Sequence, residues 1–315
     1  MEKSRITVDD LKKVKTYSLS TRKSIASRAD FGVPASAGAS LRDFLTTLPK
    51  IYMAKDLLLV AKAVRDAKEH QKVCHFAMGS HVIKNGLGPY VLDLMKQGYV
   101  TALSFNGSAL VHDFEIAFMG ATSEDVDSQI GEGKFGLAEE TAQSINRAVK
   151  AGSKDGHGLG KSVGLWIQAH TPHPEDSLLA EAVRLGIPAT VHLAVGTDIV
   201  HIHPSFDPAA SAKASYQDFL EFASSVANLE GGVYLNIGSA VILPEVFLKA
   251  ISLVRNLGHR VDAFCAVNID FIRHYRSRRN VLERPTAKGG SSIEIIGAHE
   301  LVLPLLHAAI VCEAT

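Results

Sequence analysis

The sequence predicts an α/β protein with a doubly wound, mostly parallel sheet and helices on both faces. Two observations carry this prediction: short apolar segments alternate with longer segments of helical periodicity, and the short segments are apolar throughout instead of alternating with polar residues. Such strands are buried on both faces, and right-handed crossover helices connect them. The expected strands are 73–77, 100–105, 189–195, 233–238 and 262–267.

Helices are expected before, between and after these strands. Residues 40–70 repeat apolar side chains at three- and four-residue spacing, and Pro49 should divide them into two helices. Residues 174–186 have acidic residues in the first turn and Gly186 at the end, which are start and stop signals. Pro304 should lie near the first turn of the last helix or kink that helix. The other expected helices are 85–98 after an initial turn, 113–120, 136–152, 215–231, 244–258 and 299–314, and 152–164 should be a loop or the approach to a helix.

The composition is that of a globular protein with balanced charge. The chain has 315 residues, 46% of them hydrophobic, with 33 basic and 33 acidic side chains. This balance gives no bulk attraction to nucleic acid or to a membrane surface, and no apolar run reaches the roughly 20 residues of a membrane span. The charged N-terminus lacks the apolar core of a signal peptide. Cys74, Cys265 and Cys312 lie far apart in apolar runs, so reduced thiols and a cytoplasmic location are expected.

The chain is expected to consist of an N-terminal arm and one domain. Residues 1–39 are rich in Ser, Lys and Arg, and this arm could wrap a neighbouring subunit or simply be a frayed end. Residues 40–315 should form a single α/β dinucleotide-binding domain.

The loops that follow the expected strands are candidates for a ligand site. In parallel sheets, ligands bind beyond the carboxyl ends of the strands. Four of the five loops are rich in Gly, Ser, Asn or Asp, which suit phosphate and ribose but are also ordinary turn residues. No GxGxxG follows a strand and no GxxxxGK[ST] loop is present, so a nucleotide would be held by a different arrangement.

Histidines form a second group of candidates. His201 and His203 alternate, and in a strand both side chains would lie on one face, where they could bind a metal. No HExxH motif or cysteine pair accompanies them. A hydrogen-bonding role or packing at a subunit contact is therefore favoured, and no metal is expected.

Four segments resemble deoxyhypusine synthase in their order and spacing. The resemblance covers roughly residues 50–310. The segments are "GSHVIKNGLGPYVLDLMKQGYVTALSFNGSALVHDFEIAF" (79–118), "ATVHLAVGTDIVHIHP" (189–204), "VYLNIGSAVILPEVFLKAISLVRNLG" (233–258) and "HELVLPLLHAA" (299–309).

The resemblance implies NAD bound at the sheet edge and a homotetramer with sites at subunit contacts. The family's catalytic lysine corresponds to Lys288, although Thr286 and Ala287 precede it here instead of Trp-Gly. Val111 and His112 replace the family's glutamate pair. The cofactor-binding residues that the resemblance implies are Ser80, His81, Ile83, Lys84, Asn106, Gly107, Ser108, Asp113, Gly238, Ser239, Asn268, Asp270 and His299.

The charge of the segment that corresponds to the family's substrate-binding region differs from what a polyamine substrate requires. The stretch 270–288 has two carboxylates against five arginines and Lys288. Two charges ~4 Å apart interact by about 4 kcal/mol at an effective dielectric of 20, so several unpaired arginines would repel a polyamine. An anionic small-molecule substrate is therefore expected where Arg273, Arg276 and Lys288 converge at the carboxyl edge. The substrate residues predicted are Asp198, Arg273, Arg276 and Glu283.

Three readings of function remain open at this point. The leading one is a deoxyhypusine-synthase-like protein that binds NAD and an altered, anionic substrate. The first alternative is a true aminobutyl transferase, in which neighbouring cations lower the pKa of Lys288 so that it forms an imine. The second alternative is a non-catalytic tetrameric scaffold, and the basic loop around Lys288 could also be merely solvated.

Overall fold

The computed structural model, which describes residues 5–312, contains one six-stranded sheet in which all neighbouring strands are parallel. The strand order is β3-β2-β1-β4-β5-β6. The predicted doubly wound α/β fold is therefore confirmed. The strands are β1 (Cys74–Met78), β2 (Ala102–Asn106), β3 (Ala189–His192), β4 (Val233–Ile237), β5 (Cys265–Asp270) and β6 (Ser291–Ile296).

Helices connect and cover the strands. The longer ones are α2 (Leu41–Thr47), α3 (Tyr52–Glu69), α5 (Gly88–Lys96), α6 (Gly107–Met119), α8 (Glu139–Lys154), α9 (Leu159–His170), α10 (Leu178–Leu185), α11 (Pro208–Ala227), α12 (Ile242–Asn256) and α15 (His299–Val311). The short segments are α1 (Val8–Leu11), η1 (Leu19–Thr21), η2 (Arg28–Asp30), α4 (His81–Lys84), α7 (Val126–Ile130), η3 (Pro174–Asp176), η4 (Ile199–Ile202), α13 (Tyr275–Ser277), the π-helical η5 (Arg278–Glu283) and α14 (Arg284–Thr286).

Most predicted elements are found, with shifted boundaries. Pro49 lies between α2 and α3, as expected, and Pro304 lies inside α15. The helix expected at 113–120 begins earlier, at Gly107, because the side chain of Asn106 caps it by accepting a hydrogen bond from the Ala109 N–H. The last two residues of the helix expected at 299–314 and the first four residues of the arm lie outside the described residues.

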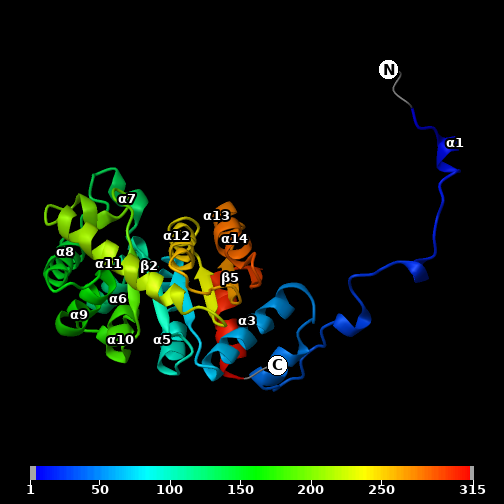
Figure 1. Cartoon of the computed structure of the whole chain (residues 1–315), viewed down its shortest axis with the longest axis horizontal. Helices are drawn as coiled ribbons and strands as arrows, with labels where there is room; N and C mark the ends of the chain where they lie inside the picture. Colours follow the sequence, from blue (N-terminus) through cyan, green and yellow to red (C-terminus); the bar gives the residue numbers. More distant parts are fainter. Residues whose placement is uncertain (1–4, 313–315) are drawn as a thin grey trace.

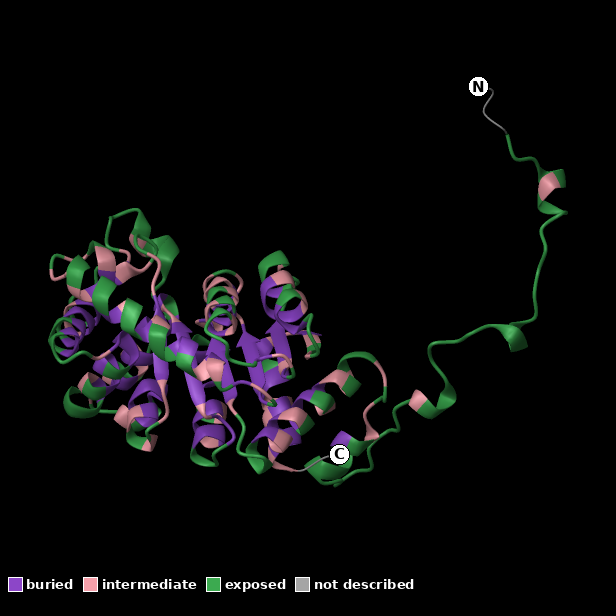
Figure 2. Ribbon diagram, in the orientation of Figure 1, coloured by how far each residue is buried: buried purple, intermediate pink, exposed green. Residues whose placement is uncertain are grey.

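Two apolar layers lie on opposite faces of the sheet. Successive residues of a strand point to opposite faces, so Tyr234 packs against Phe247 of α12 while Leu235 belongs to the other layer. α11, α12 and η5 cover the first face, and α3, α5 and α15 contribute to the second. Figure 2 shows the buried residues concentrated in the strands and on the inner sides of these helices.

A row of buried polar side chains crosses three neighbouring strands beneath α11. His75 on β1 lies 2.9 Å from Ser225 Oγ through Nδ1 and 2.7 Å from Ser104 Oγ through Nε2. Ser104 Oγ lies 2.7 Å from Thr190 Oγ1, which lies 3.0 Å from Nε2 of His192. Burial lowers the pKa of both histidines to about 3, so both are neutral at physiological pH.

The described part of the N-terminal arm carries no buried residue. Residues 5–40 run away from the sheet in Figure 1 and are exposed along nearly their whole length in Figure 2. Large apolar side chains are nevertheless frequent in this arm. Ile6, Val8, Leu11, Ile25 and Phe31 each expose more than half of their surface.

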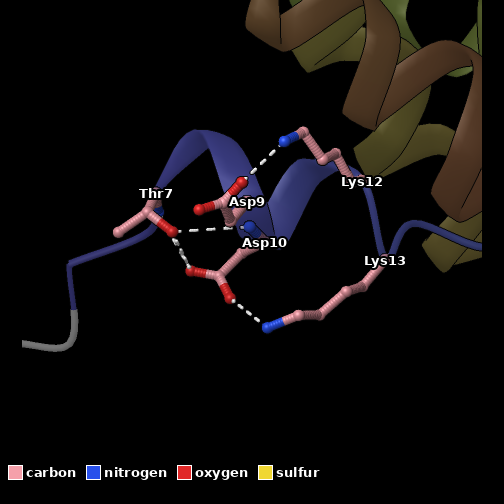
Figure 3. Close-up of polar contacts among 5 residues, drawn as sticks. All are labelled: Thr7, Asp9, Asp10, Lys12 and Lys13. Atoms are coloured by element: carbon pink, nitrogen blue, oxygen red, sulfur yellow. Dashed lines mark hydrogen bonds and ion pairs between the residues drawn. The ribbon is translucent and has the colours of Figure 1, made fainter.

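Within residues 5–39, α1 is the one α-helical turn, and local polar contacts hold it (Figure 3). Thr7 and Asp10 form a capping box, in which each side chain accepts from or donates to the other residue. Lys12 contacts Asp9 at 2.8 Å and Lys13 contacts Asp10 at 3.1 Å. All of these contacts are exposed, so they shape the turn without attaching it to the domain.

Two further expectations concern the thiols and the membrane. The three cysteines are free, as expected, and Cys74 is buried. Among residues 5–312, no helix combines the length and the apolar character needed to cross a membrane.

Candidate functional site

The strand order defines where a ligand is expected. The chain winds outward from β1 through β2 to β3, then crosses back to place β4 on the other side of β1. In open parallel sheets, ligands bind in the crevice outside the carboxyl ends of the strands at the point where the winding reverses. Here that point lies between β1 and β4, and we call it the switch-point crevice.

Glycines bring the backbones of the two loops at this crevice unusually close. The N–H of Gly79 donates to the Ile237 carbonyl at 2.9 Å, and a Cβ added to Gly79 would lie 2.1 Å from the Gly238 carbonyl oxygen. Gly238 has φ +65°, and a Cβ there would lie 3.2 Å from Nε2 of His299. Both positions therefore favour glycine, because a side chain at either one would meet the backbone of the other loop or the ring of His299.

Three rings lie together just after β1, β5 and β6, and two of them, His81 and His299, lie beside Gly238. The ring centroid of Phe271 lies 5.6 Å from that of His81 and 5.9 Å from that of His299, and the two histidine rings are 6.0 Å apart. Burial lowers the pKa of His81, and the nearby Lys84 adds to this shift. His299 is buried, whereas Phe271 is half exposed. Phe271 was not predicted as a site residue, although it lies in the segment that follows the strand expected at 262–267.

Asp270 lies at the same edge, as the last residue of β5. Its Oδ1 accepts a hydrogen bond from the Phe271 N–H at 2.8 Å, and its Oδ2 lies 3.6 Å from Nε2 of His274. Asn268 lies deeper, inside the strand, where its Oδ1 accepts from Nδ2 of Asn236 at 2.8 Å. Asn268 therefore supports the sheet below the crevice and does not line a loop.

The end of β2 collects a second group of predicted residues. Asn106 caps α6, Gly107 and Ser108 form its first turn, and Asp198 approaches from the loop after β3. A Cβ on Gly107 would lie 2.0 Å from Oδ1 of Asp198, so this contact requires glycine. Burial raises the pKa of Asp198.

Two predicted cofactor residues lie away from both groups. Ile83 is buried in the apolar core. Asp113 is buried against the start of α10, where it accepts hydrogen bonds from Ser177 Oγ and from the N–H groups of Leu178 and Leu179. Burial raises the pKa of Asp113 to about 6. These contacts account fully for both carboxylate oxygens, so the structure gives Asp113 a helix-positioning role.

Four of the five arginines after β5 are paired with carboxylates, which the local sequence did not indicate. Arg273 Nε lies 2.9 Å from Glu294 Oε2, and Arg276 Nε lies 3.4 Å from Glu245 Oε1. Both carboxylates come from other elements, so local counting could not find them. Glu283, predicted as a substrate residue, pairs instead with Arg278 and Arg279. The expectation that these arginines are uncompensated was therefore wrong for Arg273, Arg276, Arg278 and Arg279, whereas Arg284 donates to the amide oxygen of Asn280.

Lys288 does not converge with Arg273 and Arg276. It is exposed and precedes β6, whose first residue, Ser291, is in register with Cys265, the first residue of β5. Lys288 therefore lies at the amino edge of the sheet, whereas the two arginines follow the carboxyl end of β5. The predicted anion site, which required these three residues at one edge, is wrong for a single chain.

His201 and His203 are not on a strand. η4 ends between them, and Nδ1 of His203 lies 2.7 Å from Ser205 Oγ. Residues 5–312 offer one group that could hold a metal ion, and neither histidine belongs to it. That group is His173, Glu175 and Asp176, all exposed.

Comparison with known proteins places this fold in a group of related architectures. The family model described as arginine dihydrolase ArgZ-like, C-terminal, Rossmann fold, matches residues 59–157. No curated protein sequence matches the chain. Among solved structures, the ternary complex of AgrE with ornithine and NAD+ is 20% identical, with a TM-score of 0.54 over 82% of this chain and 34% of AgrE.

Two other structures are matched over more of their own length. A putative LOR/SDH protein from Methanococcus maripaludis S2 is 15% identical, with a TM-score of 0.53 over 92% of this chain and 74% of that protein. A putative deoxyhypusine synthase from Entamoeba histolytica is 12% identical, with a TM-score of 0.52 over 88% and 95%. The chain spans about a third of the length of ArgZ and AgrE. At these identities the likeness concerns the fold alone, and the Rossmann-like architecture is common to the group.

Proposed function

We propose that this protein binds NAD across the switch-point crevice. The observation that carries the proposal is the reversal of strand order between β1 and β4, with a glycine directly after each strand. Dinucleotides bind at this reversal in sheets of the same strand order. The similar fold of AgrE, whose structure is a ternary complex with ornithine and NAD+, adds support.

The residues at the crevice fit such a ligand. Gly238 is partly exposed beside the buried Gly79, so a pyrophosphate can approach its backbone, and α12 begins a few residues later. The partly exposed rings of His81 and Phe271, which lie beside the buried His299, offer a surface against which a flat heterocycle can pack. When bound, the nicotinamide would supply a hydride acceptor or donor. The paired arginines do not support an anionic substrate, so the proposal extends to the cofactor alone.

Titration calorimetry with two glycine variants tests this proposal. Gly238 and Gly258 both have positive φ, +65° and +90°, so alanine causes comparable backbone strain at each. Gly258 has no heavy atom within 4 Å of an added Cβ and lies outside the crevice. Gly238→Ala should weaken NAD binding at least tenfold, or about 1.4 kcal/mol, whereas Gly258→Ala should bind like the original protein. No heat with millimolar NAD, or equal binding by both variants, would contradict the proposal.

A further inference from the structure

A separate cavity of about 260 Å³ lies beside the carboxyl ends of β2 and β3. One face of α6 forms a wall, because its lining residues recur at three- and four-residue spacing. Its volume is below the range of about 300–1,000 Å³ that is usual for drug-sized ligands, so it suits a small metabolite. The lining residues that matter here are Lys84, Ser108, His112, Glu115, Glu124 and Asp198.

A hydrogen-bond relay fixes the orientation and the tautomer of His112. Nδ1 of His112 lies 2.6 Å from Thr122 Oγ1, and that hydroxyl donates to Glu115 Oε2 at 2.5 Å. Thr141 donates to the other oxygen of Glu115 at 3.0 Å. The hydroxyl group of Thr122 has one proton, which it donates to Glu115. Its oxygen can therefore only accept a hydrogen bond from His112, so Nδ1 of His112 must carry a proton. The lone pair of the neutral ring therefore resides on Nε2.

Burial and nearby positive charge keep the Nε2 lone pair of His112 unprotonated, so that it can accept a hydrogen bond. Burial is the main cause that lowers the pKa of His112 to about 4, and Lys84 and His81 lower it further. His112 is therefore neutral at physiological pH. Lys84 of α4 brings positive charge to the cavity, whereas Glu124 and Asp198 bring carboxyl groups from the loops before α7 and after β3. Glu115 of α6 is a third lining carboxylate, and Thr122 and Thr141 already donate to its two oxygens.

We propose that this cavity is a second ligand site, which takes a small carboxylate bearing a hydroxyl or amino group. Lys84 attracts the ligand's carboxylate. Nε2 of His112 accepts a hydrogen bond from the ligand's hydroxyl or amino group, and Asp198 adds a second acceptor. The ligand needs both features, because a plain carboxylate would leave the acceptors unpaired in a partly buried site. The site does not depend on NAD.

The first experiment examines the relay without any ligand. Nitrogen and carbon chemical shifts of labelled histidine side chains should identify His112 as the Nδ1–H tautomer. Thr122→Val should abolish this preference. Thr141→Val is the matched control, because it also removes a hydroxyl that donates to Glu115 but leaves the contact between Thr122 and His112 intact. An Nε2–H tautomer in the original protein would overturn the assignment, even if Thr122→Val failed to fold.

The second experiment compares L-alanine, L-lactate and propionate, which share a carbon skeleton and differ in carrying an amino group, a hydroxyl or neither. Alanine or lactate should shift the His112 resonances at concentrations at least tenfold below those needed for propionate. Whichever binds better identifies the preferred donor group. Lys84→Met should weaken the binding of alanine and of lactate at least tenfold. Lys84 is exposed, so this substitution should leave folding intact.

Three outcomes would overturn the proposal. They are no response of His112 to any of the three compounds, an equal response to all three, and displacement of the bound compound by NAD. The last outcome would assign the cavity to the cofactor. Failure of NAD to bind at all would leave the ligand responses unchanged, so the two proposals are tested separately.

Discussion

Asp218 provides a sharp test of how burial controls the stability of this fold. Its carboxylate lies on α11 and is almost completely buried, with 3% of its surface exposed. Oδ2 accepts hydrogen bonds from the N–H groups of Gly160 at 3.0 Å and Val191 at 2.7 Å. It therefore caps the start of α9 and ties that helix to β3. A Cβ on Gly158 would lie 1.7 Å from Oδ1, so no other side chain can share this position without movement.

The pKa of this carboxyl group sets the sign of the pH effect. Burial raises the pKa of Asp218 to about 7 from 3.8, against the opposing effect of its backbone donors; nearby Glu221 raises it slightly. The folded state thus binds the proton more tightly than the unfolded state. The contribution of Asp218 to stability is complete below pH 3.8 and declines as pH rises through about 7. At 1.36 kcal/mol per pKa unit, the decline is at most about 4 kcal/mol.

Urea denaturation of the original protein and of Asp218→Asn between pH 5 and pH 8 measures this effect. Asparagine resembles the protonated carboxyl group in having one acceptor oxygen and no charge. The free energy of unfolding of the original protein should fall relative to that of the variant as pH rises, by about 1–3 kcal/mol over this range. Taking the difference removes the contribution of Asp113, which both proteins share. Parallel profiles, or a relative rise with pH, would refute the reasoning.

Three further predictions follow from the described geometry. Gly79→Ala should lower the free energy of unfolding by about 1–3 kcal/mol, seen as a lower melting temperature, because the methyl group would collide with the Gly238 carbonyl; an unchanged melting temperature would show that the loops can separate freely. Deletion of residues 1–38 should lower the oligomeric state in sedimentation if the exposed apolar arm clasps a neighbouring subunit in a homotetramer, and an unchanged assembly would speak against the clasp. Borohydride trapping with spermidine and NAD should leave Lys288 unmodified, because this lysine lies at the sheet edge opposite the switch-point crevice; a mass increase on Lys288 would instead favour the transferase alternative.

Five strands of the parallel sheet could be predicted from the sequence because they are apolar on both faces. The sixth, β6, could not be predicted, because "SSIEII" mixes serine and glutamate with isoleucine. β6 is an edge strand, bonded to β5 alone, and its first two residues are exposed. A strand of this kind does not need an uninterrupted apolar run. Because β6 was not predicted, the position of Lys288 at the amino edge of the sheet could not be predicted either.

The candidate site was predictable where it depends on strand ends and unpredictable where it depends on distant partners. Ser80, His81, Gly238, Ser239, Asp270 and His299 were all expected at one edge, and the structure brings them there. The carboxylates that pair with Arg273 and Arg276 belong to β6 and α12, so charge counted along a local stretch was misleading. The relay that ends at Glu115 was equally hidden, because Thr122 and Thr141 lie in segments that reveal no partner by spacing.

The buried row from Ser225 to His192 has a consequence for how this protein can change. A hydroxyl or a neutral imidazole offers one proton to the row, so the direction of each hydrogen bond constrains the next one. Replacing a single member would leave a neighbour without its partner, and four of the five members are buried. Substitutions along the row should therefore be tolerated as coordinated sets across β1, β2, β3 and α11. The same dependence favours a single register of these strands. A shift of any strand by one residue would leave several buried polar groups without hydrogen-bond partners.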